Sequence, residues 1–148
     1  MRRRAHIYLG ARVKEAIVAA LHHNSAGISF EQDDPAVVAD WRQGPGLAAA
    51  LRLALERFSP QERDLRGYKR TEWPSYRVSN SRSLREFEAT YICIGVQALN
   101  GAEFFYDAEA YPPGEEDIAL HVTLNRYGPD EEIDRKLLKL FNACVDWP

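Results

Sequence analysis

Thr90-Tyr91-Ile92-Cys93-Ile94-Gly95-Val96 decides the fold, because it belongs to the densest run of strand-forming residues in the chain. Residues 102–111 follow it and alternate apolar with acidic or aromatic side chains, which is typical of a half-buried strand. Asn100-Gly101 between them is a hairpin signal. Residues 118–125 alternate in the same way. The sequence therefore predicts an antiparallel meander with strands at 90–98, 102–111 and 118–125.

The hairpin loop decides which side chains share a face of this meander. A two-residue turn would pair Leu99 with Ala102 and place Ile92, Ile94 and Val96 on the same face as Asp107 and Glu109. That arrangement would mix charged side chains with the apolar residues of the core. A three-residue loop with Gly101 in the left-handed conformation pairs Leu99 with Glu103 and separates the two kinds of side chain. We therefore expect the three-residue loop. One face then holds Ile92, Ile94, Val96, Ala98, Phe104, Tyr106, Ala108 and Ala110, and the other holds Tyr91, Gln97, Glu103, Phe105, Asp107, Glu109 and Tyr111.

A helix is the alternative for residues 84–100. Leu84, Phe87, Tyr91, Ile94 and Ala98 also have helical spacing. Ser83 and Glu86 have the spacing of a capping box, and Gly101 is suited to end such a helix. A helix throughout 84–100 would contradict the register above.

The remaining chain adds helices to the meander. Strands are expected at 6–9 and 28–30, helices at 13–23, from Pro35 to about Gln43, at 47–58, from Pro60 to Gly67 and at 130–145, and loop or edge strand at 68–85. We find no internal repeat or linker. These elements predict one α+β domain over residues 1–148, with a mostly antiparallel sheet centred on the meander and helices packed on one face.

Composition indicates an ordinary globular protein. The chain has 148 residues, 45% of them hydrophobic and 28% charged, so it should bury roughly two-thirds of its unfolded surface without needing disulfides or metals. No apolar run approaches the roughly 20 residues of a membrane span, and no signal-peptide core follows the first arginines. We therefore expect a cytoplasmic protein. Cys93 and Cys144 lack metal-site spacing, so we expect reduced thiols.

Charge is divided unevenly along the chain. Residues 1–85 hold 15 Lys and Arg against 9 Asp and Glu, whereas residues 86–148 hold 4 against 13. The acidic half coincides with the meander and its flanks. This asymmetry favours a basic partner, or pairing with the basic half, and argues against nucleic acid at the meander.

The residues that could carry catalysis form no known motif. His22 and His23 are expected at a helix end, where a basic side chain suits the helix dipole, and His6 and His121 are expected at the surface. No serine-hydrolase elbow, phosphate-binding loop or zinc-protease pattern is present. We therefore expect no enzyme activity, no cofactor and no metal.

Two other functions remain as alternatives. Asp107-Ala108-Glu109 places two acids on one side of a strand, as in Mg²⁺ nucleases, but Ala110 and Tyr111 follow where restriction-endonuclease-like enzymes usually have a lysine. The segment Tyr68–Arg85 combines arginines with Trp73 and Tyr76 and could bind RNA by phosphate contacts and base stacking. An overall pI near 5.8 is a poor match for RNA binding.

The chain as a whole resembles the small immunity proteins that protect bacteria from their own contact-dependent or polymorphic toxins. The likeness lies in the small α+β domain, the acidic stretch Glu103–Asp117, the terminal helix that starts with Asp130-Glu131-Glu132, and the lack of a catalytic motif. There is no diagnostic signature, so no residue role is carried over. The resemblance implies binding of one cognate toxin, often a nuclease, whose substrate site is blocked by acids in place of phosphates.

Alternation and charge in this sequence predict where such a partner binds. Acids and aromatic residues share one face of the meander, and three more acids follow in the next turn. Aromatic residues are enriched in protein interfaces. The expected contact residues are Glu103, Phe105, Asp107, Glu109, Tyr111, Glu115, Glu116 and Asp117.

Overall fold

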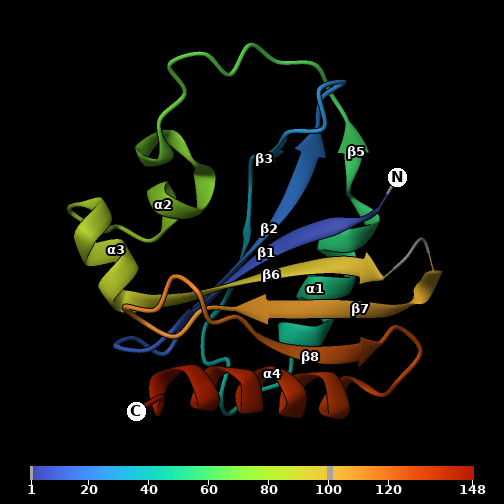
Figure 1. Ribbon diagram of the computed structural model, residues 1–148, viewed down its shortest axis with the longest axis vertical. Coiled ribbons are helices and arrows are strands. Elements are labelled where there is room, and N and C mark those ends of the chain that lie inside the picture. Colours follow the sequence, from blue (N-terminus) through green and yellow to red (C-terminus); the bar gives the residue numbers. More distant parts are fainter. Residues whose placement is uncertain (1, 100–101) are drawn as a thin grey trace.

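The computed structural model describes residues 2–99 and 102–148, and its centre is one mixed sheet (Figure 1). The strands are β1 (Arg4–Gly10), β2 (Ala16–His23), β3 (Ser29–Glu31), β4 (Ala36–Val38), β5 (Ser59–Pro60), β6 (Tyr91–Leu99), β7 (Ala102–Ala110) and β8 (Leu120–Asn125). The helices are α1 (Leu47–Glu56), α2 (Pro74–Val78), α3 (Leu84–Thr90) and α4 (Asp130–Val145), with a 3₁₀ turn at Arg70–Glu72. The sheet order is β3-β2-β1-β6-β7-β8, and β4 and β5 also pair with β2. All pairs are antiparallel except β2–β5.

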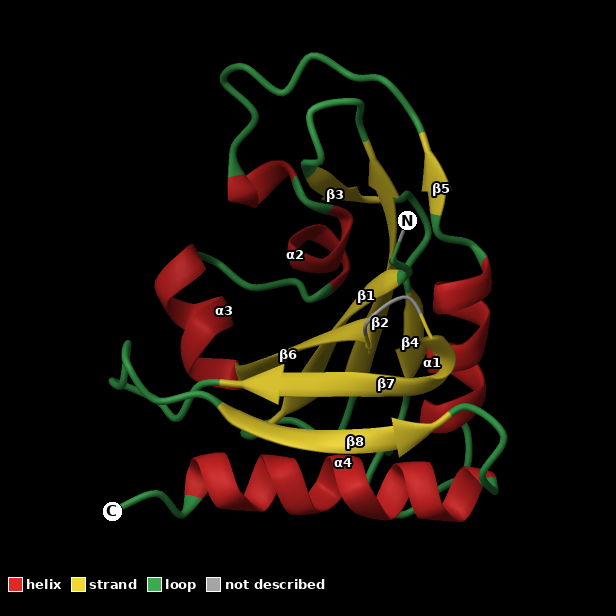
Figure 2. Ribbon diagram, turned by 45° about the vertical axis from the view of Figure 1, so that its right-hand side comes forward, coloured by secondary structure: helices red, strands yellow, loops and turns green. Residues whose placement is uncertain are grey.

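The predicted α+β fold is confirmed, including the meander β6-β7-β8 and the helices over 47–58 and 130–145. Helices α1 and α4 cover one face of the sheet (Figure 2). Leu51 of α1 and Leu137 of α4 pack there with Ile94 and Ala108 of the meander. No helix in the described ranges is long and apolar enough to cross a membrane.

The register of the β6–β7 hairpin agrees with the expected faces but not with every expected pair. Ala98 lies opposite Tyr106, whereas the three-residue loop would place it opposite Phe104. This shift of two residues leaves the remaining side chains on their predicted faces. The expected Leu99–Glu103 pair is wrong, because a register irregularity after Ala98 sets Leu99 opposite Ala102, the pair expected for a two-residue turn. The loop residues themselves, Asn100 and Gly101, lie outside the described ranges.

Phe104 lies outside the core, close to this irregularity. The alternation places it on the aliphatic face, but the residue is 60% exposed. Its ring instead lies 5.6 Å from that of Tyr127. A bulge breaks the alternation of a strand locally and so turns a side chain away from its expected face.

The helix expected at 13–23 is wrong, since Ala16–His23 form strand β2. Val18 packs in the core beneath α1, while the next residue, Ala19, packs on the opposite face. A strand buried on both faces carries apolar residues at every position. Such a continuous run also contains apolar residues at helical spacing, so periodicity alone does not separate the two structures.

Two short helices expected from proline and capping signals are also wrong. The first, from Pro35 to Gln43, is replaced by β4, which pairs with residues 16–18 of β2. The second, from Pro60 to Gly67, is replaced by β5 and irregular chain, and the Gln61 backbone N–H donates to the carbonyl of His23 at 2.9 Å. In both cases pairing with the edge of β2 outweighs a local helix signal.

Both interpretations of residues 84–100 are partly right. Ser83 caps α3 through its Oγ, which accepts a hydrogen bond from the Glu86 backbone N–H at 3.1 Å. The helix ends at Thr90, and β6 begins at the next residue. The preceding segment 68–85, expected as loop or edge strand, holds the 3₁₀ turn and α2.

Helices α2 and α3 cover only part of the second face of the sheet. Phe87 of α3 packs there with Tyr8, Ile17 and Tyr91. Tyr91, expected on the acidic and aromatic face, lies on that face but is buried beneath the helix. The two helices stand over one end of the sheet and leave the outer side of β7 and β8 uncovered (Figure 2).

Candidate functional site

The uncovered part of the second sheet face, here called the open face, is formed by Gly95, Phe105, Asp107, Glu109, Tyr111 and His121. Cross-strand pairing places His6 opposite Gly95, Gly95 opposite Glu109, and Glu109 opposite His121. A Cβ at Gly95 would meet nothing within 4 Å, so the middle of this row is open. Gly95 and Glu109 line a cavity of about 150 Å³ on this face, together with His6 and Gln97.

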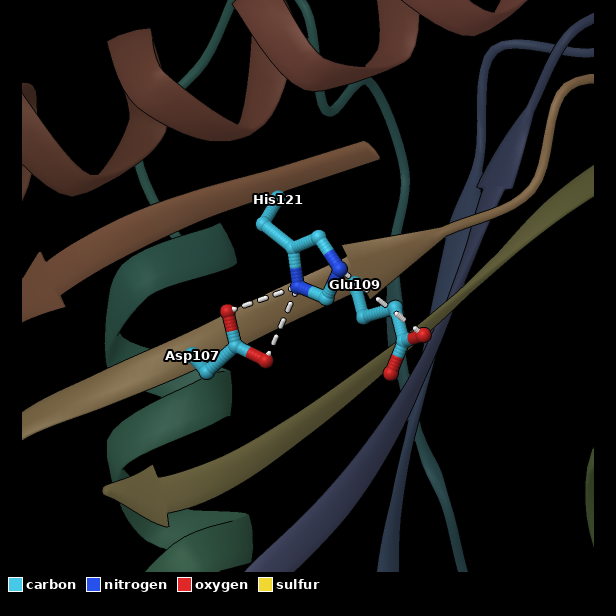
Figure 3. A group of neighbouring side chains, drawn as sticks. All are labelled: Asp107, Glu109 and His121. Atoms are coloured by element: carbon cyan, nitrogen blue, oxygen red, sulfur yellow. Dashed lines mark hydrogen bonds and ion pairs between the residues drawn. The ribbon is translucent and has the colours of Figure 1, made fainter. Parts of the chain in front are cut away.

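Asp107, Glu109 and His121 form a compact group in the open face (Figure 3). His121 on β8 lies between the two acids of β7, with its Nδ1 3.0 and 3.1 Å from the two carboxylate oxygens of Asp107. Its Nε2 is 4.0 Å from Oε1 of Glu109. The sequence placed His121 on the polar face of its strand but gave no sign that it would meet these acids, because strand register decides that contact.

Aromatic side chains flank the acids on the open face. Phe105 is 46% exposed and Tyr111 is 51% exposed. A hydrogen bond to Glu109 raises the pKa of the Tyr111 hydroxyl. Because alternation places these aromatic residues on both sides of Asp107 and Glu109, the face combines apolar area with negative charge.

Glu103 has a different environment from the other expected contact residues. Its carboxylate lies 3.2 Å from Arg3 Nε and 3.0 Å from Arg126 Nη1. These hydrogen bonds and charges lower the pKa of Glu103. Glu103 is thus paired within the chain, whereas no Lys or Arg lies within 4.0 Å of Asp107 or Glu109 among the described residues.

Glu115, Glu116 and Asp117 lie in the connection between β7 and β8, beyond Tyr111. Glu116 and Asp117 are exposed and Glu115 is partly buried. Glu115 and Tyr111 line a cavity of about 340 Å³, and Cys93 and Arg70 form other parts of its wall. The structure therefore groups Phe105, Asp107, Glu109 and Tyr111 with Glu115 near one end, and sets Glu103 apart.

Glu31 is the centre of a buried hydrogen-bond network that the sequence does not predict. Its carboxylate accepts hydrogen bonds from the Tyr8 hydroxyl at 2.5 Å and from the Ser75 backbone N–H at 3.0 Å, and lies 3.3 Å from His6 Nδ1. Burial opposes ionisation, but the hydrogen bonds from His6, Ser75 and Tyr8 hold the pKa of Glu31 below its usual value. Glu31 directly follows the strand expected at 28–30 and is followed by polar residues, so no local pattern marks it as buried. Its partners come from distant parts of the chain.

The other three histidines each contact side chains from other parts of the chain. His6 stacks on Trp73 at 6.1 Å, so it is not the simple surface residue that was expected. His22 Nδ1 lies 3.1 Å from Ser59 Oγ. His23 packs edge-on against Phe58. The expected helix end for His22 and His23 is wrong, because both lie in β2.

The basic segment 68–85 is tied to the rest of the chain. Arg70 pairs with Glu88 at 2.7 Å. Trp73 stacks on His6, and Tyr76 packs against Phe87. The two aromatic residues that would stack on RNA bases therefore make contacts inside the protein.

Comparison with known proteins identifies a similar fold. A solved structure, the protein of unknown function NMB0488 from Neisseria meningitidis, superposes with a TM-score of 0.64 and 12% sequence identity over 97% of this chain and 96% of that chain. At this identity the likeness shows the fold alone. No protein-family model matches the sequence, and no curated protein matches it.

Proposed function

We propose that the protein is an inhibitory binding protein of the toxin-immunity type, which captures a cognate toxin in the cytoplasm. The toxin presents a basic surface, and the open face covers it. A nuclease toxin fits this chemistry best, because Asp107 and Glu109 then take the place of substrate phosphates. The protein itself performs no catalysis in this function.

The observation that carries the proposal is the combination of exposed aromatic residues and acids without Lys or Arg partners. Phe105 and Tyr111 are about half exposed, and aromatic residues are typical anchors of protein interfaces. Asp107 and Glu109 have no Lys or Arg ion pair among the described residues. A basic partner supplies the missing charges while it buries the aromatic rings.

The charge of the surrounding chain supports the same kind of partner. Residues 86–148 hold 13 acids against 4 Lys and Arg, and Glu116 and Asp117 extend the negative charge beyond the open face. Opposite charges on two proteins speed their encounter and disfavour wrong partners. A tight inhibitor of a toxic enzyme benefits from fast association.

The experiment coexpresses the chain with the product of the gene immediately upstream, because an immunity gene normally follows its toxin gene. We expect that the upstream product alone stops growth, that coexpression restores it, and that the two proteins elute together in size-exclusion chromatography. Growth inhibition that the chain does not relieve contradicts the proposal. So does Mg²⁺-dependent cleavage of nucleic acid by the purified chain, or a salt-dependent shift of labelled RNA.

A further inference from the structure

The group formed by Asp107, Glu109 and His121 has a feature that an acidic patch lacks, an imidazole nitrogen brought in from a second strand. One ligand atom from each of the three residues lies within 4.8 Å of the other two. Ligands around a single ion bound at about 2 Å lie at most roughly 4 Å apart, so small side-chain rotations bring all three to one ion. Figure 3 shows the imidazole ring between the two carboxylates.

The group also has no Lys or Arg partner among the residues that the structure describes. The Asp107 side chain is only 14% exposed, and the Glu109 side chain is 32% exposed. Among the described residues their one basic neighbour within 4.0 Å is His121. A half-buried carboxylate is normally compensated by a cation, because burial disfavours the charged form. Two acids beside one histidine therefore form a site suited to a cation.

We propose that Asp107, Glu109 and His121 bind one divalent transition-metal ion, of which Zn²⁺ is the best match. Imidazole suits zinc and its neighbours in the first transition series, whereas Mg²⁺ and Ca²⁺ prefer oxygen ligands alone. Zinc accepts three protein ligands and leaves a fourth position for water or another donor. Gly95 lies opposite Glu109 and has free space above its Cα, so the fourth position has room on the open face.

This site does not depend on the proposed function, because it needs no protein partner. A bound dication neutralises the two carboxylates that a basic toxin would contact, so metal and toxin compete for the same residues. Metal binding by the isolated chain tests the site, whereas the coexpression experiment tests the toxin partner. The chain can fail to bind metal and still capture the toxin, or bind metal and fail to capture the toxin.

The test is titration of the purified full chain with Zn²⁺ by calorimetry and with Co²⁺ by visible absorption. A Cys93→Ser background removes the exposed thiol, because a cysteine thiolate is in general a good ligand for zinc. We expect one ion per chain with micromolar affinity. Asp107→Asn, Glu109→Gln and His121→Ala should each weaken metal binding at least about tenfold. Even the loss of a residue that only hydrogen-bonds to a metal ligand lowers metal affinity roughly 10- to 100-fold.

Matched controls separate the site from general surface binding. Glu116→Gln removes an exposed acid outside the group, and His22→Gln removes a histidine of β2, so neither should change the affinity. Circular dichroism of each metal-free variant checks that folding is intact. Binding that survives His121→Ala, binding of Mg²⁺ as tight as that of Zn²⁺, or no saturation below millimolar Zn²⁺ would overturn the proposal.

Discussion

Glu31 accepts a hydrogen bond from the Ser75 backbone N–H at 3.0 Å, and this contact joins strand β3 to the first turn of α2. Trp73, at the N-cap of α2, contributes no side-chain hydrogen bond, so Glu31 supplies from a distant strand what a capping residue usually supplies locally. The same carboxylate accepts a hydrogen bond from Tyr8 of β1. One acid therefore holds α2 against the sheet beside the open face.

Replacing Glu31 should loosen α2. Glu31→Gln keeps the size of the side chain but loses the charge-assisted hydrogen bonds, so we expect the free energy of unfolding to fall by about 1–3 kcal/mol. Urea denaturation measures the loss, and hydrogen exchange should show reduced protection at α2. Glu116→Gln, an exposed acid, is the control and should change stability little. Unchanged protection at α2 would contradict the tethering role.

Stability should also depend on pH through Glu31. Hydrogen bonds hold its folded-state pKa below the unfolded value of 4.5 despite burial. A lowered folded-state pKa contributes stability above the unfolded value, and that stability is lost as the pH falls from about 4.5 through the folded-state pKa. Denaturation at a series of pH values should therefore show that acidification lowers the free energy of unfolding less in Glu31→Gln than in the native chain. Glu103→Gln should reduce that loss less, because the Glu103 ion pairs are exposed and screened by water.

Two glycines should respond oppositely to alanine. A Cβ at Gly10 would lie 2.3 Å from the carbonyl oxygen of Val13 and 2.4 Å from that of Glu15, so the β1–β2 connection must distort. We expect Gly10→Ala to lower the free energy of unfolding by about 1–3 kcal/mol, as overpacking typically does. Gly95→Ala, with nothing within 4 Å, should be neutral or stabilise by roughly 0.5–1 kcal/mol. Thermal unfolding of both variants measures the contrast, and equal losses would show that close approach is not the cause.

Charge reversal on the open face should slow capture of a basic partner. The double variant Asp107→Lys with Glu109→Lys should reduce the association rate most at low salt, because the new lysines repel an approaching basic partner and salt screens that repulsion. Surface plasmon resonance with the captured toxin at several salt concentrations measures this. Glu131→Lys with Asp146→Lys makes the same change in net charge on exposed positions of α4 and its end, and should have a smaller effect.

Truncating the aromatic residues should act on dissociation instead. Phe105→Ala or Tyr111→Ala should speed dissociation and cost about 2 kcal/mol of binding free energy where the ring is a buried anchor. Leu53→Ala removes an exposed apolar side chain from α1, on the opposite face, and should leave binding unchanged. Binding that survives these changes and the charge reversal, but is lost on substitution of arginines in 68–85, would place the contact surface on the basic segment.

Local patterns in the sequence were enough to predict the meander and the two long helices. Residues 105–110 alternate because one face of this part of β7 is buried and the other is not, and a period of two in the sequence reports that directly. The helices α1 and α4 each bury one stripe, which gives the spacing seen at Leu47, Leu51 and Leu55 or at Ile133, Leu137 and Leu140. Where a segment is buried on just one side, the period of its apolar residues shows whether it is a strand or a helix.

Only the tertiary structure decided the identity of β2 and the composition of the open face. Strand β2 is covered on both sides, so its sequence has no period that distinguishes strand from helix. Glu103 and Glu109 look alike in the sequence, but Arg3 and Arg126 pair with the first and not with the second. The meeting of His121 with Asp107 depends on the register between β7 and β8. Such contacts join residues far apart in the chain, and no local pattern records which side chains the folded sheet brings together.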